Sequence, residues 1–242
     1  AFAGTLGWGR PGALEPADLT TQDAVAVQRR IAAQRAAGVE LLAMEVSSHA
    51  LDQGRVRAVA FDVAVFTNLS RDHLDYHGTM ARYGEAKRLL FLTETLETAV
   101  VDVDDAFGAT LPERIPAPVR CLRLSSRDAG ADLHLSEVEA IPAGLRFRLE
   151  TPWGSARPEV PLFGAFNARN VALAVGALCA LGHDFSSLLD RLGALEAVPG
   201  RLQRLGGDAG RPLVFVDYAH GPDALAKALE AVRAHARGRV LC

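Results

Sequence analysis

The sequence has little cysteine, no long apolar run and no excess of charge of one sign, and each scarcity narrows what the chain can be. Cys121, Cys179 and Cys242 are far apart and have no metal-binding or redox spacing, so we expect reduced thiols. No apolar run approaches the ~20 residues of a membrane helix, and the opening residues do not form a signal peptide. The net charge of −3 gives no sign of a nucleic-acid partner. We therefore expect a cytoplasmic protein.

The length and the ends of the chain predict a piece of a larger protein. Its 242 residues allow one large domain, or one domain and part of another. There is no initiator methionine, and residues 238–242 resemble a buried strand that stops as it begins. We therefore expect a fragment.

Hydrophobic periodicity predicts alternating strands and helices in the first half of the chain. Helices are expected near 22–37, 79–91 and 105–113, a short helix and turn near 48–57, and apolar strands near 39–46, 61–67 and 99–103. The strand at 39–46 should be covered on both faces. This alternation is typical of an α/β fold with a doubly wound, mostly parallel sheet.

The rhythm changes after about residue 119. Period-two alternation near 133–138, 145–149 and 160–162 predicts a small antiparallel sheet appended to the parallel one. Helices are expected near 167–181 and 186–195, and Pro199-Gly200 is a candidate hinge. Strands at 213–216 and 240–242 and a helix at 222–236 would begin a second, Rossmann-like α/β domain. The expected domains are therefore 1–199 and 200–242, the second truncated.

Two polar segments follow neighbouring predicted strands. Glu45 lies in an apolar strand next to Ser47, and an ionised carboxylate there needs a partner such as a metal or a cation. The other interpretation is a glutamate that reaches solvent, with the serines only capping the next helix. Residues 67–77 carry carboxylates and imidazoles that suit a magnesium-phosphate site, although a solvated loop would also be polar. By its pattern alone, Lys87 is a solvated helix residue.

Several segments in order along the chain resemble the Mur ligases. They are Glu45-Val-Ser-Ser-His49, the run from Phe66 to Gly78, Ala86-Lys87, the run from Gly164 to Asn170, Pro199-Gly-Arg201, and Val216-Asp-Tyr-Ala-His220. The resemblance covers essentially the whole chain. Among Mur ligases, these segments look most like the branch that adds the third amino acid to the peptidoglycan peptide.

The resemblance implies an ATP-dependent amide ligase that joins an amino acid to a UDP-N-acetylmuramoyl-dipeptide through an acyl phosphate, as a monomer. It implies Mg²⁺ as cofactor, held by Glu45, by His73 and by Lys87 as a carbamate, and these three residues are the expected catalytic ones. The implied substrate-binding residues are Thr20, Thr21, Ser47, Gln53 and Arg55, and the implied ATP-binding residues are Asn170, Arg201, Asp217 and His220.

Departures from the family pattern leave alternatives open. The family's Gly-rich phosphate loop is not in this sequence, so we expect the chain by itself to be inactive. Asp102 stands where the family commonly has Asn, and Gly221 where Thr is common. A folylpolyglutamate synthase or another Mur ligase would share most of these features. A non-catalytic nucleotide-binding protein that has lost its phosphate loop is the alternative from another class.

Overall fold

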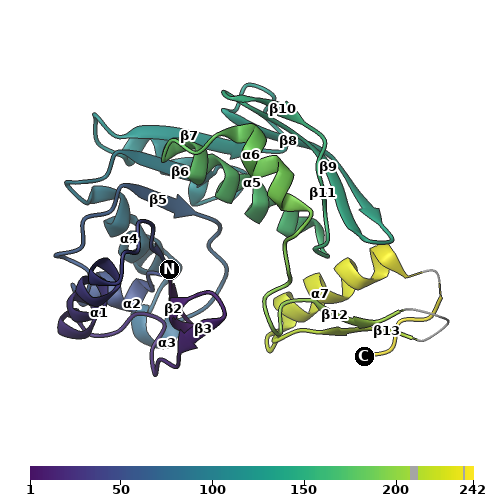
Figure 1. Cartoon of the computed structure of the whole chain (residues 1–242), viewed down its shortest axis with the longest axis horizontal. Helices are drawn as coiled ribbons and strands as arrows, with labels where there is room; N and C mark the ends of the chain where they lie inside the picture. Colours follow the sequence, from purple (N-terminus) through teal and green to yellow (C-terminus); the bar gives the residue numbers. More distant parts are fainter. Residues whose placement is uncertain (208–211, 237) are drawn as a thin grey trace. The chain divides into compact units, whose positions relative to one another are not determined.

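Short strands and helices alternate along the chain in the computed structural model, which describes residues 1–207, 212–236 and 238–242 (Figure 1). The chain divides into two units, each discontinuous in sequence. The first unit comprises Ala1–Ala64, Asn68–Ala99 and Glu113–Arg120. The second comprises Val65–Thr67, Val100–Pro112 and Cys121–Cys242. Among the described residues, no helix is both long and apolar enough to span a bilayer.

The first unit contains a small sheet made from the start of the chain. Its strands are β1 (Phe2–Gly4), β2 (Gly7–Arg10), β3 (Ala13–Glu15) and β4 (Ala43–Met44), in the spatial order β3-β2-β1-β4. β1 is antiparallel to β2 and parallel to β4. Buried Ala3 and Trp8 from these strands pack with Val27 of helix α1 (Ala24–Ala36), and this contact fixes the helix on the sheet.

The strand expected over 39–46 is present only as the two-residue β4, and none of these residues is buried. In the described sheet, β4 lies at the edge and pairs with β1. An edge strand leaves one side of its backbone open, so it is not enclosed as a central strand would be. The prediction was right about the strand's place but wrong about its length and burial.

Three short helices follow β4 in the first unit. They are α2 (Ser48–Asp52), α3 (Leu74–His77) and α4 (Met80–Arg88), and the 3-10 turn η1 (Leu89–Leu92) continues α4. The hydroxyl of Ser47 caps α2 by accepting a hydrogen bond from the Ala50 N–H at 3.2 Å. Thr79 caps α4 in the same way, through the Arg82 N–H at 3.2 Å. These caps confirm the helices expected after residues 47 and 78.

A larger sheet lies mainly in the second unit. Its spatial order is β10-β9-β8-β7-β6-β5, with β11 paired to β9. Its strands are β5 (Val63–Phe66), β6 (Thr98–Asp102), β7 (Arg120–Ser125), β8 (Leu133–Ile141), β9 (Gly144–Thr151), β10 (Gly154–Ala156) and β11 (Glu159–Val160). β7 and β8 are parallel, whereas β9 is antiparallel to β8, β10 and β11. The expected mixture of a parallel sheet and an appended antiparallel one is confirmed.

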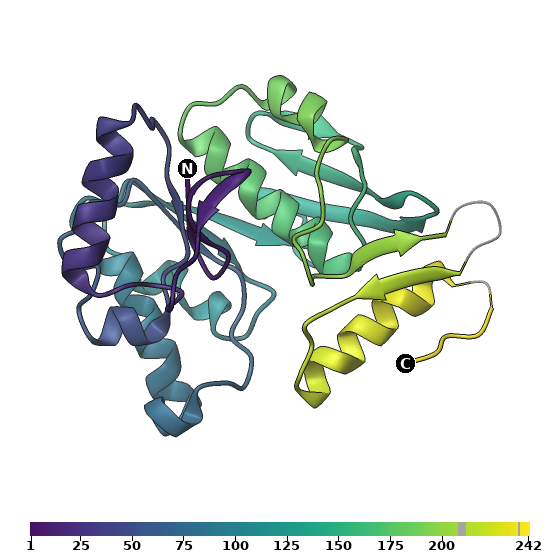
Figure 2. The same ribbon diagram turned by 60° about the horizontal axis from the view of Figure 1, so that its bottom comes forward.

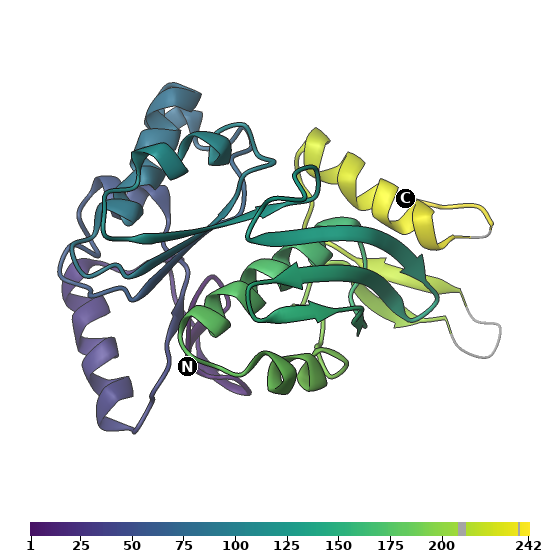
Figure 3. The same ribbon diagram turned by 90° about the horizontal axis from the view of Figure 1, so that it is seen from above.

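Helix α5 (Ala165–Ala180) packs on strands β8 and β9 (Figure 3). Its Gly176 allows a close approach, because a Cβ atom there would lie 2.5 Å from a Leu133 methyl group. Helix α6 (Phe185–Leu192) follows, and its start is capped by the Asp184 carboxylate. Both helices agree with the sequence prediction, apart from shifts of a few residues at their ends.

The helix expected at 105–113 is replaced by two 3-10 turns, η2 (Gly108–Thr110) and η3 (Pro112–Arg114). Pro112 has no N–H to continue an α-helix. The Asp105 carboxylate instead accepts hydrogen bonds from the backbone N–H groups of Phe107 and Gly108, both at 2.9 Å. This side-chain turn competes with the helical pattern, so the prediction of a helix was wrong.

The C-terminal part of the second unit pairs β12 (Gln203–Gly206) with β13 (Leu213–Val216), and helix α7 (Pro222–His235) lies beside them (Figure 2). Leu202, Ala228 and Ala231 are buried there with Phe163. Strand β13 and helix α7 confirm the prediction, whereas β12 was not expected because it lacks an apolar run. Residues 240–242 form no strand, and no described strand pairs with them, so that prediction was wrong.

Candidate active site

Glu45 follows β4 directly, and its exposed carboxylate lies beside the turn between β1 and β2. One of its oxygens, Oε2, accepts hydrogen bonds from the Thr5 hydroxyl at 2.6 Å and from the Thr5 backbone N–H at 3.0 Å. The sequence predicted a metal or a cation as the partner of this carboxylate. The structure shows a neutral partner that orients the carboxylate without cancelling its charge. Sequence reasoning missed Thr5, because Thr5 and Glu45 are 40 residues apart.

The two threonines before α1 have different surroundings. The Thr20 hydroxyl lies 3.1 Å from the Thr5 hydroxyl, close to the Glu45 carboxylate. Thr21 is buried, and its hydroxyl donates to the Glu45 carbonyl at 2.9 Å and accepts from the Ser47 N–H at 3.0 Å. Thr21 therefore fixes the end of β4, while Thr20 lies at its surface.

Gln53 and Arg55 belong to one hydrogen-bond network with Tyr76. Arg55 donates to the Gln53 side-chain oxygen from Nε at 2.9 Å and from Nη2 at 2.5 Å. Gln53 donates to the Tyr76 hydroxyl at 3.1 Å, and that hydroxyl donates to Asp52 at 2.8 Å. A further bond runs from Arg55 Nη1 to the Thr21 carbonyl at 2.9 Å. The structure thus connects all five residues predicted to bind the muramoyl dipeptide to the surroundings of Glu45.

Three histidines and two tyrosines form a ring cluster in the first unit. His73 contacts His49, with ring centroids 4.9 Å apart, and Tyr83, with centroids 5.7 Å apart. His77 stacks on Tyr83 at 5.2 Å. The fifth member, Tyr76, contacts His49, with ring centroids 4.2 Å apart. The sequence prediction included only His73 from this cluster. The four-residue spacing of Tyr83 and Lys87 on α4 is the signal that could have found more of it.

Burial favours the neutral form of two imidazoles of this cluster, those of His49 and His77. Burial lowers the pKa of His49, and the neighbouring His73 lowers it further. Burial also lowers the pKa of His77, whose Nε2 lies 2.9 Å from the Ser48 hydroxyl. Nearby aspartates raise the pKa of both rings, but by less than burial lowers it. His49 and His77 are therefore more readily neutral than an exposed histidine.

Lys87 is half-buried, and its ammonium nitrogen lies 5.1 Å from the centre of the Tyr83 ring. Burial lowers the pKa of Lys87, and the charge of Asp72 opposes this shift only in part. The sequence pattern by itself suggested a solvated lysine, and the structure contradicts that interpretation. A larger fraction of neutral amine is available here than at an exposed lysine, so Lys87 is suited to react as a nucleophile.

The residues expected near ATP lie in the second unit. Asn170 is exposed on α5 and donates to the Asn167 side chain at 3.1 Å. Asp217 accepts hydrogen bonds from the Leu202 and Ala219 N–H groups, both at 2.8 Å. Two further predicted residues flank the Tyr218 ring, with the Arg201 guanidinium 5.9 Å and the His220 ring 5.4 Å from it. Asp217 therefore shapes the loop, and Arg201 and His220 lie beside one exposed aromatic ring.

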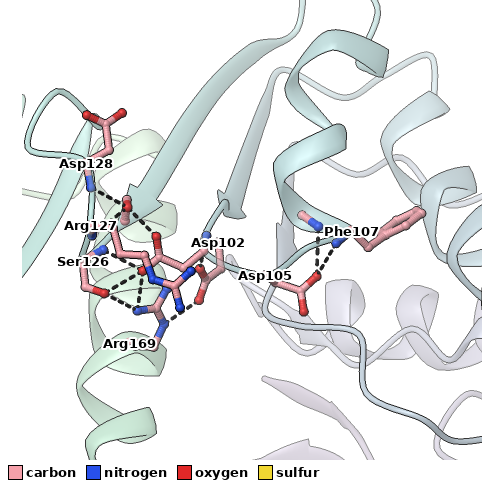
Figure 4. A network of polar contacts seen from close by, with 10 residues as sticks. Asp102, Asp105, Phe107, Ser126, Arg127, Asp128 and Arg169 are labelled. Carbon is pink, nitrogen blue, oxygen red and sulfur yellow. Dashed lines mark hydrogen bonds and ion pairs between the residues drawn. The ribbon is translucent and has the colours of Figure 1, made fainter.

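A dense ion-pair network connects the carboxyl ends of β6 and β7 with α5 (Figure 4). Arg169 Nε donates to Asp102 at 2.7 Å, and Nη2 bonds the other oxygen of the same carboxylate. Arg169 Nη1 lies 3.0 Å from Asp104 and also donates to the Ser126 hydroxyl at 3.0 Å. All three guanidinium nitrogens therefore have an acceptor. No local sequence pattern indicates this network, because Arg169 and Asp102 are 67 residues apart.

Asp104 accepts several hydrogen bonds in addition to its ion pair with Arg169. It accepts from the Ser125 hydroxyl at 2.5 Å, and from the Ser126 N–H and hydroxyl at 2.8 and 2.6 Å. Burial by itself would raise the pKa of Asp104, but hydrogen bonds from Ser125, Ser126 and Arg169 outweigh burial and lower the pKa far below its usual range. The carboxylate therefore stays ionised although it is almost enclosed.

Comparison with known proteins covers both parts of the chain. Residues 1–178 match the family described as the Mur ligase middle domain, and residues 200–242 match the Mur ligase glutamate ligase domain. A UDP-N-acetylmuramoyl-L-alanyl-D-glutamate–2,6-diaminopimelate ligase from Ectopseudomonas mendocina (strain ymp) is 50% identical over 241 residues, which are 100% of this chain and 49% of that protein. The ligase of the same name from Pseudomonas aeruginosa (strain PAO1) is 49% identical over 241 residues, again 100% of this chain and 49% of that protein.

Solved structures agree with these matches. The structure of a UDP-N-acetylmuramoyl-L-alanyl-D-glutamate–2,6-diaminopimelate ligase superposes with a TM-score of 0.86 and 37% identity, covering 97% of this chain and 48% of that one. The apo folylpolyglutamate synthase of L. casei gives a TM-score of 0.69 at 21% identity, covering 83% of this chain and 48% of that one, which shows the fold alone. The chain spans about half the length of the relatives it matches. The Mur ligase middle domain matches most of the chain, and the second Mur ligase domain follows it in sequence. The chain therefore belongs to the Mur ligase family.

Proposed function

We propose that the full-length protein that carries this chain is a MurE-type ligase. It would join meso-diaminopimelate, as the third amino acid, to UDP-N-acetylmuramoyl-L-Ala-D-Glu in peptidoglycan biosynthesis, using ATP. The observation that carries this proposal is the 50% identity to a diaminopimelate ligase over essentially the whole chain. We also propose a monomer in the cytoplasm, with residues 1–199 as the central ATPase domain and residues 200–242 as the beginning of the C-terminal domain.

The chemistry has two steps. The γ-phosphoryl group of ATP passes to an oxygen of the glutamate side-chain carboxylate, which breaks the bond to ADP and gives an acyl phosphate. The substrate amine then attacks the acyl carbon through its lone pair, forming the C–N bond. The C–O bond to phosphate breaks, phosphate leaves with its electron pair, and the amine loses a proton. Positioning and charge stabilisation are expected to supply most of the rate.

Glu45, His73 and Lys87 are the residues that would hold magnesium. Among the described residues, no group of three or more His, Cys, Asp or Glu could hold a metal ion. Mg²⁺ does not require such a cage, because it keeps several waters and binds through one or two carboxylates together with substrate phosphates. The exposed Glu45 carboxylate, held at one oxygen by Thr5, fits that requirement. When bound, the metal neutralises charge on the phosphate oxygens.

Lys87 would join this set as a carbamate. The ammonium first loses a proton to solvent. The lone pair of the neutral amine then attacks the carbon of carbon dioxide, one C=O π bond opens to an oxyanion as the N–C bond forms, and the nitrogen loses a second proton, so that the cation becomes an anion with two oxygen ligands. Burial of Lys87 and its lowered pKa favour this reaction, because only the unprotonated amine has a free lone pair. Lys87 and Lys227 are the two lysines of the chain, and Lys227 is exposed on α7.

The remaining predicted residues have roles that their surroundings support. Thr20, Gln53 and Arg55 lie at the surface of the Glu45 network and would bind the dipeptide and its phosphates directly. Thr21 and Ser47 would act mainly by holding the end of β4 in place. On the second unit, Asn170, Arg201, Asp217 and His220 would bind ATP. Arg55 and Arg201 suit these two assignments because a guanidinium can form two parallel hydrogen bonds to a carboxylate or a phosphate.

The test is phosphate release by the full-length protein with ATP, magnesium and UDP-N-acetylmuramoyl-L-Ala-D-Glu, with diaminopimelate or lysine in separate reactions. We expect release that depends on diaminopimelate, and a loss of roughly 100-fold or more in Lys87→Ala. Lys227→Ala is the matched control and should keep full activity. Release with lysine alone would overturn the choice of amino acid. No release with either amine, together with activity on a folate, would overturn the ligase assignment.

A further inference from the structure

The Tyr76 side chain connects the ring cluster of the first unit with the hydrogen-bond network of Gln53. Its hydroxyl donates to the Asp52 carboxylate at 2.8 Å and accepts from the Gln53 amide nitrogen at 3.1 Å. Its ring contacts those of His49 and His77, with centroids 4.2 and 4.8 Å away. Tyr76 is 40% exposed, whereas His77 is buried. The cluster therefore holds the ring, while the hydroxyl reaches the surface.

The chemistry of the groups determines the direction of each hydrogen bond at Tyr76. An ionised carboxylate only accepts, so the single hydroxyl proton of Tyr76 lies in the bond to Asp52. The hydroxyl oxygen can then only accept, and the amide nitrogen of Gln53 faces it. A guanidinium only donates, so the amide oxygen of Gln53 faces Arg55, at 2.9 and 2.5 Å from Nε and Nη2. The bonds therefore run in one direction, from the Arg55 guanidinium to the Asp52 carboxylate, and each polarises the next.

Arg55 keeps donors that a ligand can use. Its bond from Nη1 to the Thr21 carbonyl, at 2.9 Å, is a single contact about which the guanidinium could pivot. The Gln53 oxygen is the second contact, and it fixes the plane of the group. A guanidinium carries five N–H groups. Three of them are used in these bonds, so two remain without an acceptor among the residues that the structure describes.

We propose that Tyr76 is a positioning residue that holds Gln53 and, through it, the plane of the Arg55 guanidinium for the acidic dipeptide of the muramoyl substrate. This inference rests on the proposed function, in which Gln53 and Arg55 bind that dipeptide. Gln53 is exposed, and an exposed side chain of this length samples several rotamers unless it is anchored. Side chains that are ordered beforehand cost less entropy when the substrate binds, so the effect of Tyr76 is on affinity for the dipeptide.

The experiment measures kcat, KM for UDP-N-acetylmuramoyl-L-Ala-D-Glu and KM for ATP in the full-length protein. Tyr76→Phe keeps the ring in its contacts with His49 and His77 and removes only the hydroxyl. We expect KM for the dipeptide substrate to rise about fivefold, with kcat and KM for ATP nearly unchanged. Thr151→Val is the control, because it removes a hydroxyl bonded to the Gly154 carbonyl at 2.9 Å, and it should match the wild type. An unchanged KM for the dipeptide substrate, or an equal rise for ATP, would overturn the proposal.

A double-mutant cycle separates positioning from general support of the fold. If Tyr76 acts through Gln53, then Tyr76→Phe in a Gln53→Ala background raises KM for the dipeptide substrate no further. Additive effects of the two substitutions contradict the proposal, and so does a Gln53→Ala enzyme with the KM of the wild type.

A second variant covers the case in which Tyr76→Phe does not fold, as judged by thermal unfolding. Asp52→Ala removes an exposed carboxylate and with it the acceptor that fixes the hydroxyl proton of Tyr76. It should also raise KM for the dipeptide substrate and leave KM for ATP unchanged, and the absence of this difference would refute the role of Tyr76. Failure of the wild type to use the dipeptide substrate at all would instead refute the proposed function itself.

Discussion

Two clusters, one in each unit, use their charged groups in opposite ways: the first comprises the Glu45 network and the ring cluster with Lys87, and the second is the network around Arg169. In the first, the Glu45 carboxylate has a neutral hydroxyl and an amide as partners, and the Lys87 amine lies over an aromatic ring. In the second, Arg169 meets two carboxylates, and Asp104 has three further donors. The first cluster therefore leaves charge available for ligands, while the second uses its charge to hold elements together. Polar density alone does not identify a catalytic site.

The largest expected effect is on stability, at Arg169. Arg169→Met leaves the Asp102 and Asp104 carboxylates buried without their cation, and we expect it to lower the free energy of unfolding by about 3 kcal/mol. Urea denaturation of the full-length protein measures the loss. Arg148→Met, in an exposed ion pair with Glu150, should change little. Equal effects of the two substitutions would contradict the contrast between the clusters.

Glu45→Gln should show the reverse behaviour. The amide keeps an oxygen that can accept from Thr5, so we expect an unchanged midpoint of unfolding. Ligase activity should fall roughly 100-fold, because the substitution removes the negative charge that would hold magnesium. Activity is measured by phosphate release and stability by urea denaturation of the same preparation. A destabilised but fully active variant would show that Glu45 serves the fold.

Acid should disturb the two clusters in different pH ranges. The lowered pKa of His77 means that the unfolded chain binds its proton first, so this contribution to stability is complete above about pH 6.5 and declines as the pH falls below that value. The lowered pKa of Asp104 gives stability that is complete above about pH 4 and is lost only at lower pH. The stability of wild type and His77→Asn should therefore depend differently on pH below about pH 6.5. Exposed His183→Asn is the control, and the same slope for all three proteins would refute the expectation.

The smallest expected effect concerns Thr5. Thr5→Val removes the hydroxyl that holds Glu45 and keeps the backbone N–H, so we expect the magnesium concentration for half-maximal activity to rise about threefold. Titration of magnesium at saturating ATP measures this change. Thr110→Val, which removes a hydroxyl bonded to the Phe107 carbonyl, is the matched control. A lower kcat at saturating magnesium, without a shift in the titration, would argue against a role through Glu45.

The sequence predicted local patterns well and long-range partners poorly. β13 and α7 were predicted nearly residue for residue, because an apolar run and a Pro at the helix start are local signals. The helix at 105–113 failed because the Asp105 turn and Pro112 outweigh the apolar pattern. For the candidate site, family resemblance selected Glu45, His73 and Lys87. The contact of Thr5 with Glu45 and the Arg169 network could not be predicted, because only the fold brings their partners together.

The 67-residue separation of Asp102 and Arg169 also bears on how the chain folds. Closing a loop of that length costs entropy before any contact repays it, so we expect the forked contact of Arg169 with Asp102 to form after β6, β7 and α5. For contacts that form after the folding transition state, weakening them speeds unfolding and leaves the folding rate almost unchanged. We therefore expect weakening of this contact to shorten the lifetime of the native state more than it slows folding.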